Sequence, residues 1–323
     1  MRIRASAEAR SDNTLMQSER QAEESVAAAN GRLRPSLLVV GVARNCEKSV
    51  HDDVLRLFDS MKGHGSLSWL VIESDSQDNT VEALRGLERT VPKFRFISLG
   101  SLRHALPNRT QRIAYCRNKY LEQLDSNPLY ADIDYVVVGD LDGVNNLITS
   151  DGFESCWMRS GWDVCTANQR GPYYDIWALR HSLWSPNDCW KQCQFLLDHK
   201  VPREAALMAS VYSKYIVLNE TDDWIEVESA FGGLAVYRRA ALKGAQYVGL
   251  DEQGESICEH VVLHRTIRKN GHKIFINPAF VNGADSEHIR ERTFVRRLRR
   301  HYRAFRDQAK TLFNGAVSPG KVG

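Results

Sequence analysis

The chain has 323 residues, of which 43% are hydrophobic and 26% are charged. This composition is that of an ordinary globular protein, and it excludes a wholly disordered, collagen-like or disulfide-scaffold protein. At this length we expect one large α/β domain, or one domain with an appended lobe.

The net charge of +3 is a property of one end of the chain. Residues 288–310 hold nine Arg or Lys side chains against two acidic ones, so the remainder is net acidic. Because only this tail is basic and the sequence contains no known nucleic-acid-binding motif, we do not expect the protein to bind nucleic acid. The sequence shows no membrane-spanning run and no signal-peptide pattern, and its seven cysteines are scattered. We therefore expect a cytoplasmic protein with reduced thiols.

The first half of the chain alternates between strand and helix patterns. Residues 1–35 are polar and predict a solvated N-terminal arm. Beyond this arm we expect a strand from Ser36, a helix over Glu47–Met61, a strand over Leu67–Ile72, a helix over Asn79–Glu88, a strand over Phe94–Leu99, a helix over Arg109–Leu124 and a strand over Tyr135–Val138. This alternation predicts an α/β fold with a Rossmann-like, mostly parallel twisted sheet flanked by helices. Ligands of such sheets bind beyond the carboxyl ends of the strands.

The region from 151 to 285 is rich in aromatic residues. Seven of them fall within 34 residues: Trp157, Trp162, Tyr173, Tyr174, Trp177, Trp184 and Trp190. Aromatic faces stack well on the C–H surfaces of sugars, although they are also common in ordinary cores. Later in this region we expect a strand over Gly232–Tyr237, a helix over Ile257–Arg268 and a strand over His272–Ile276.

Asp140-Leu141-Asp142 follows the last apolar strand of the first half. Two carboxylates at one strand end suit Mg²⁺ or Mn²⁺, which can neutralise a diphosphate. The alternative interpretation of this Asp-x-Asp motif is a solvated turn or a helix cap. The strand before it and the glycines on both sides favour the metal site.

Two other segments place polar residues near the same sheet edge. Glu73 and Asp75 follow the second predicted strand, where they could face a nucleotide base or ribose. The alternative is an ordinary helix N-cap in this segment, with Asp78 or Ser76 accepting helix amide protons. Arg109, Arg112 and Cys116 share one side of a helix, which indicates either a basic edge near a diphosphate or ordinary surface charge.

Residues 259–264 form the densest group of chemically active side chains. His260 and His264 are four residues apart on a predicted helix, as a metal-binding pair would be, and Glu259 is adjacent. The alternative is one exposed histidine and one histidine held in the core.

These residues together resemble a known group of enzymes. The order of an Asp-x-Asp after the fourth strand, a Gly-Gly strand and a late histidine is similar to that of glycosyltransferases with the GT-A fold. More narrowly, Tyr174-Asp175-Ile176-Trp177-Ala178-Leu179-Arg180 resembles the Tyr-Asp-x-Trp-Ala-x-Arg segment of fungal capsule-associated mannosyltransferases. Residues 110–118 are similar to their Arg- and Asn-containing helix, and residues 259–264 are similar to their Glu-x-x-Leu-Leu-His segment.

The resemblance implies a GT-A sugar transferase with a nucleotide-sugar-binding half at 36–150 and an acceptor-binding half at 151–285. The donor would be a nucleotide sugar, with GDP-mannose as the first candidate and a UDP-sugar as the other. The implied site residues are Glu259 and Asp175 for catalysis, Arg44, Glu73, Asp75, Arg112, Arg117, Asp140 and Trp177 for donor binding, and Asp140, Asp142 and His264 for a Mn²⁺ or Mg²⁺ ion. Glu259 would be the general base if the anomeric configuration inverts, and would only orient the acceptor if it is retained.

Residues 286–323 are expected to form a basic amphipathic helix and tail. Apolar residues recur at spacings of three and four from Val295 to Leu312, flanked by arginines. Such a helix would pack on protein or hold the enzyme peripherally on an anionic membrane, on the inner face of the cytoplasmic membrane, beside a lipid-linked acceptor. Two further functions stay open: a nucleotidyltransferase acting on sugar phosphates, and a non-catalytic sugar-binding module.

Overall fold

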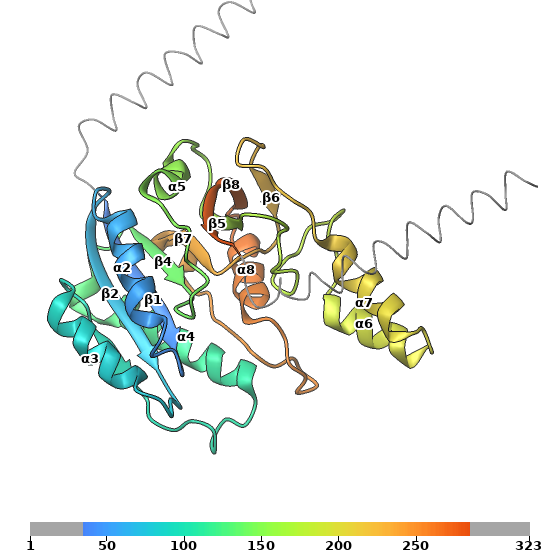
Figure 1. Cartoon of the computed structure of the whole chain (residues 1–323), viewed down its shortest axis with the longest axis horizontal. Helices are drawn as coiled ribbons and strands as arrows, with labels where there is room; N and C mark the ends of the chain where they lie inside the picture. The colour runs from blue at the N-terminus through green and yellow to red at the C-terminus, as the bar shows by residue number, and fades with distance from the viewer. Residues whose placement is uncertain (1–34, 285–323) are drawn as a thin grey trace, which may run out of the picture. The chain divides into compact units, whose positions relative to one another are not determined.

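Residues 35–284 are described by a computed structural model, in which they build one eight-stranded sheet flanked by helices (Figure 1). The expected arm before Pro35 and the expected helix and tail at 286–323 lie outside the described residues. The strands are β1 (Ser36–Ala43), β2 (Ser66–Glu73), β3 (Phe96–Ser98), β4 (Tyr135–Gly139), β5 (Val164–Gln169), β6 (Ile225–Val227), β7 (Leu234–Arg238) and β8 (Ile274–Gly283). The α-helices are α2 (Val50–Met61), α3 (Thr80–Thr90), α4 (Arg109–Ser126), α5 (Ser150–Glu154), α6 (Cys189–Asp198), α7 (Arg203–Ser210) and α8 (Glu259–Lys269). Short 3₁₀ helices are η1 (Pro128–Tyr130), η2 (Ser155–Trp157), η3 (Tyr212–Lys214) and η4 (Arg239–Leu242).

The strand order is β3-β2-β1-β4-β7-β5-β8-β6. Strand β1 pairs in parallel with β2 and β4, β2 with β3, and β5 with β8. Strand β7 runs antiparallel to both β4 and β5, and β6 runs antiparallel to β8. The α/β fold with a mostly parallel sheet is thus confirmed, and the sheet continues without a break across the expected boundary at residue 150.

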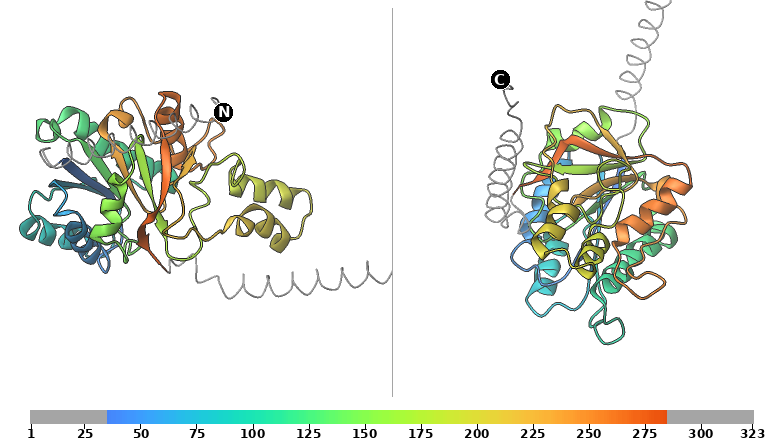
Figure 2. Two further views of the ribbon diagram at one scale, coloured as in Figure 1. Left: turned by 90° about the horizontal axis from the view of Figure 1, so that it is seen from above. Right: turned by 90° about the vertical axis from the view of Figure 1, so that its right-hand side faces the viewer.

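The core lies on both faces of this sheet because the strands alternate their side chains. Leu38 and Val40 of β1 point into one apolar cluster, together with residues of α4 and α8. Leu37 and Val39 point into a second cluster on the opposite face, together with residues of α2, α3 and α5. Figures 1 and 2 show these helix layers, and they show α6 and α7 packed on each other to one side of the sheet. The parallel strands β1, β2 and β4, which are buried on both faces, bring their carboxyl ends to one edge of the sheet.

Two expected boundaries move for local reasons. The predicted strand at Gly232 begins instead at Leu234, because Gly232 and Gly233 have φ of 72° and 87° and form a turn. The helix expected from Glu47 begins at Val50, after a turn in which Cys46 O accepts from Ser49 N and Val50 N.

Two further findings concern the described residues as a whole. None of their helices is both long and apolar enough to cross a membrane. All seven cysteines fall within this part of the chain, where they are buried and form no disulfide.

Candidate active site

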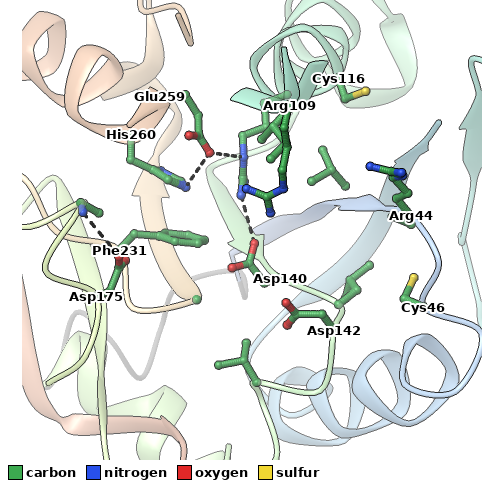
Figure 3. A pocket seen from close by; sticks show the side chains of 18 of the residues that line it. Arg44, Cys46, Arg109, Cys116, Asp140, Asp142, Asp175, Phe231, Glu259 and His260 are labelled. Atoms are coloured by element: carbon green, nitrogen blue, oxygen red, sulfur yellow. Dashed lines mark hydrogen bonds and ion pairs between the residues drawn. The ribbon is translucent and has the colours of Figure 1, made fainter. Parts of the chain in front are cut away.

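A cavity of about 850 Å³ opens where β1 and β4 end (Figure 3). Helix α4, residues 231–233 and the start of α8 complete its wall. Eight of the residues expected from the sequence line this one cavity: Arg44, Arg112, Arg117, Asp140, Asp142, Asp175, Trp177 and Glu259. The strand-end rule thus predicted the location of the cavity correctly.

The backbone of the turn that carries Asp140 and Asp142 is held from several sides. Asp140 N donates to Gly233 O at 2.9 Å, and Asn145 Nδ2 donates to Asp140 O at 2.6 Å. Helix α2 and its N-cap residue supply two more contacts: the N-cap Ser49 donates through Oγ to Leu141 O at 3.0 Å, and the carboxylate of Asp53 accepts from Gly143 N at 2.6 Å. Both sequence-predicted metal carboxylates therefore stand on a fixed turn.

The environment of Asp140 disfavours its charged form. Burial raises the pKa of its carboxyl to about 7, with smaller contributions from Asp142, Glu259 and Asp175, although the Arg117 guanidinium opposes the shift. A cation bound beside two carboxylates would remove this penalty, so the site is suited to bind a positive ion.

The buried Arg117 side chain links Asp140 to Glu259. Its side chain is 3% exposed, its Nη2 lies 3.0 Å from Asp140 Oδ1, and its Nε lies 3.2 Å from Glu259 Oε1. The guanidinium also lies over the Phe231 and Tyr247 rings, at 5.3 and 5.6 Å from their centroids. Its pKa is raised by the neighbouring carboxylates and tyrosines despite burial, so this cation is permanent.

Three further arginines line the cavity. Arg112 is buried, donates through Nη1 to Leu106 O and Pro107 O, and lies 3.6 Å from Asp75. Arg44 and Arg109 are exposed and form no ion pair with any described residue. These two guanidiniums are free to bind an anion.

The start of α8 places Glu259 and His260 at the opposite wall. Glu259 is the first residue of the helix, and its Oε1 accepts the Arg117 contact. The His260 ring stacks on Phe231, with centroids 3.8 Å apart and planes at 20°. Figure 3 shows Glu259, His260, Phe231 and Asp175 on this side, facing Arg44 across the cavity.

Asp175 and Trp177 reach the cavity through a tightly bonded loop. Asp175 accepts from Gly232 N at 2.9 Å and from Ala178 N at 3.4 Å. Trp177 Nε1 donates to Asp188 Oδ2 at 3.0 Å, and Arg180 donates to the same oxygen. Asp175 thus fixes the glycine turn that holds Phe231, and Trp177 presents part of its ring to the cavity.

Glu73 and Asp75 do not line this cavity. They line a second one of about 390 Å³, with Ser98, Ser101 and Arg103. Both carboxylates hold local structure: Glu73 accepts from Ser76 N and Ser98 Oγ, and Asp75 accepts from Leu102 N and Arg103 N. Of the two residues named in the cap alternative, Asp78 accepts from Thr80 N, the first residue of α3, at 3.1 Å.

His264 requires a correction. It is fully buried outside the cavity, and both ring nitrogens are occupied: Nδ1 by Ser229 Oγ and Nε2 by Tyr237 OH, each at 2.9 Å. Burial lowers its pKa to about 3, so the ring is neutral. His264 is a core residue and not the expected metal ligand, and the described residues contain no group of three His, Cys, Asp or Glu that could hold a metal ion.

Sequence reasoning missed two residues of this site and assigned a third to another role. Phe231 and the buried Asp53 gave no signal, since a lone Phe or an acidic residue on an amphipathic helix is common. His260 was noticed only as one half of a metal pair. Its position at the first turn of α8, beside Glu259, was the available signal.

Comparisons with known proteins identify no family. No family model matches, and no curated protein matches. Among solved structures, the chain is similar to the mannosyltransferase PcManGT from Pyrobaculum calidifontis in complex with GDP-Man and Mn²⁺, at 14% identity and a TM-score of 0.43, over 78% of this chain and 57% of that one. It is also similar to glucosyl-3-phosphoglycerate synthase from Mycobacterium tuberculosis in complex with UDP, at 16% identity and a TM-score of 0.37, over 77% and 68% of the two chains. Neither TM-score reaches 0.5, so the residues of the site carry the functional conclusion.

Proposed function

We propose that the protein is a metal-dependent glycosyltransferase of the GT-A type, which transfers a sugar from a nucleoside diphosphate to a glycan or lipid-linked glycan. One observation carries this proposal. Asp140 and Asp142, at the carboxyl end of a central strand, share a cavity with unpaired arginines on one side and a carboxylate with aromatic rings on the other.

The donor set fits Mn²⁺ or Mg²⁺. These cations are commonly held by one or two carboxylates together with phosphate oxygens of the substrate. Asp140 and Asp142 supply two carboxylates, and residues 35–284 contain no group of three His, Cys, Asp or Glu that could hold the ion without the substrate. When bound, the cation would stabilise the charge that develops on the leaving diphosphate.

The arginines complete the donor side. Arg44 and Arg109 are free to pair with phosphate oxygens. Such charged hydrogen bonds stabilise a developing negative charge most strongly where water is excluded. Arg112 and Arg117 would hold neighbouring protein groups in position and would not bind the phosphates directly, because their guanidiniums already contact protein oxygens. Trp177 offers an aromatic surface for the sugar or nucleotide. Glu73 and Asp75 would reach the donor only where it extends into the second cavity.

The acceptor hydroxyl would approach from the side of α8. Glu259 is the carboxylate that would take its proton or orient it, and Asp175 would support that wall through Gly232.

GDP-mannose is the first candidate donor, because the segment resembling fungal capsule mannosyltransferases, 174–180, lines the cavity with Tyr174, Asp175 and Trp177. The basic segment 288–313, if helical, would bring the enzyme to anionic lipid, which vesicle co-sedimentation tests.

The test is nucleotide binding followed by turnover. We expect GDP or UDP to raise the melting temperature more in Mn²⁺ than in EDTA, and a panel of sugar nucleotides to contain one that is hydrolysed or transferred. Asp142→Asn should lose both effects while keeping its fold. Transfer of a nucleotidyl group instead of a sugar would favour the nucleotidyltransferase, and sugar binding without turnover would favour the binding module.

A further inference from the structure

His260 is a buried polar residue without a hydrogen bond in the described part of the chain. Its side chain is 4% exposed, it lines the main cavity, and neither ring nitrogen has a hydrogen-bond partner. Glu259 Oε1 lies 3.8 Å from Nε2, which is too long for a hydrogen bond. Buried polar groups are nearly always bonded, so this one indicates a ligand.

Aromatic packing, and not hydrogen bonding, fixes the ring. Phe231 stacks on one face, and Tyr247 meets the ring edge-on at 5.5 Å and 86°. Because both neighbours are apolar surfaces, the imidazole is held rigidly while its nitrogens stay available to a ligand in the cavity.

The ring is also neutral. Burial, the Arg117 guanidinium and His264 all lower its pKa well below 6.5. A neutral imidazole offers one N–H donor and one acceptor nitrogen. A hydroxyl group also donates and accepts, whereas a phosphate or carboxylate only accepts, so the hydroxyl is the better partner for His260.

The charges of the cavity agree with this choice. Arg44 and Arg109 line the cavity without an ion pair to any described residue, while Arg117 is already engaged by Asp140 and Glu259. Around His260 the lining includes the carboxylates Glu259 and Asp175, which would repel an anion.

We propose that His260, supported by Phe231, binds a hydroxyl of an uncharged sugar acceptor, and that this subsite takes no phosphate or carboxylate group. The inference rests on the proposed glycosyltransferase function. To that function the inference adds two details: His260 contacts the acceptor, and the acceptor group bound there is uncharged.

The experiment separates donor use from acceptor use. Hydrolysis of the sugar nucleotide in water and transfer to acceptors are measured for the wild type, His260→Phe and His260→Gln, with neutral methyl glycosides set against sugar phosphates and 3-phosphoglycerate. His51→Gln is the matched control, since His51 lies on the exposed face of α2. His260→Gln guards against a folding defect, because an amide also donates and accepts.

We expect His260→Phe to raise the KM for the neutral acceptor by about tenfold or more, the effect of one lost hydrogen bond, while the affinity for the nucleotide changes by less than about twofold. His260→Gln should recover part of the loss. A wild type that turns over donor but prefers phosphorylated acceptors would overturn the subsite alone, as would an unchanged acceptor KM in His260→Phe. A wild type that neither binds nor hydrolyses any sugar nucleotide would overturn the proposed function itself.

Discussion

Protons and a divalent cation would compete for Asp140, because burial raises the pKa of its carboxyl to about 7. Metal binding requires the ionised carboxylate, so below pH 7 each bound cation must displace a proton. We predict that Mn²⁺ affinity falls about tenfold per pH unit below 7 and levels off above it. Titration of free Mn²⁺ by electron paramagnetic resonance, at constant ionic strength from pH 5.5 to 8.5, measures this.

The Asp140 carboxyl affects the stability of the metal-free protein in the opposite direction: lower pH weakens Mn²⁺ binding but favours the folded state. Its pKa is higher in the folded protein than in the unfolded chain, so the folded state binds the proton more tightly. Its contribution to the free energy of unfolding is therefore present at low pH and is lost as pH rises from about 4 to 7. A Mn²⁺ affinity that does not change between pH 5.5 and 8.5 would show that Asp140 is not a ligand.

Arg117 should be needed for stability as well as for the site. Arg117→Met would leave Asp140 and Glu259 facing each other without their cation, and removing one partner of a buried ion pair costs about 3–5 kcal/mol. Urea unfolding measures this loss. Arg85→Met is the control, because Arg85 pairs with Glu82 at the surface and should contribute less than about 1 kcal/mol. Equal losses in the two variants would mean that the buried bridge is no stronger than a surface pair.

At the scale of single residues, the sequence could identify chemistry but not the direction of a side chain. His260 and His264 share a helix and a spacing that suits a metal, yet one lines the cavity and the other bonds to Ser229 and Tyr237 in the core. Tyr237 belongs to a distant strand, so no local pattern could show that both nitrogens of His264 are occupied.

Helix α2 is the element that supports the Asp140–Asp142 turn. Asp53 is fully buried, and its carboxylate accepts from Gly143 N. We predict that Asp53→Ala lowers Mn²⁺ affinity by about tenfold or more, as loss of a group that orients a metal ligand does, although Asp53 itself touches no metal. Asp52→Ala is the matched control, since Asp52 is the preceding residue of the same helix and is 62% exposed. Mn²⁺ affinity in folded Asp53→Ala that equals that of Asp52→Ala would contradict this support.

At the scale of elements, the first half was predictable and the second only in part, because β7, α8 and β8 were expected whereas β5, β6, α6 and α7 were not. Strands β1, β2 and β4 are apolar runs buried on both faces, the strongest pattern for a parallel sheet. Strand β5 is also buried throughout, but it contains Thr166, Asn168 and Gln169, whose polar groups bond to other segments. The polar side chains of β5 form hydrogen bonds with residues far away in the sequence, so β5 lacks the apolar run that predicts a buried strand. The sequence analysis therefore did not predict it.

At the scale of the whole molecule, one sheet joins the two expected halves, and this decides how the protein folds. Strand β4 ends the first half, but one of its edges pairs along its length with β7 of the second half, from Tyr135–Arg238 to Gly139–Leu234. A fragment of residues 36–150 would therefore expose an apolar central strand as an edge, which favours aggregation over folding. We predict that this fragment shows no cooperative thermal transition, whereas residues 36–284 unfold in one step, because β7 and β5 couple both halves. Circular dichroism melts of both pieces provide the measurement, with residues 151–284 as the complementary control. A cooperative melt of the 36–150 fragment alone would show that these residues are an independent folding unit and that the continuous sheet forms only when the two fragments dock.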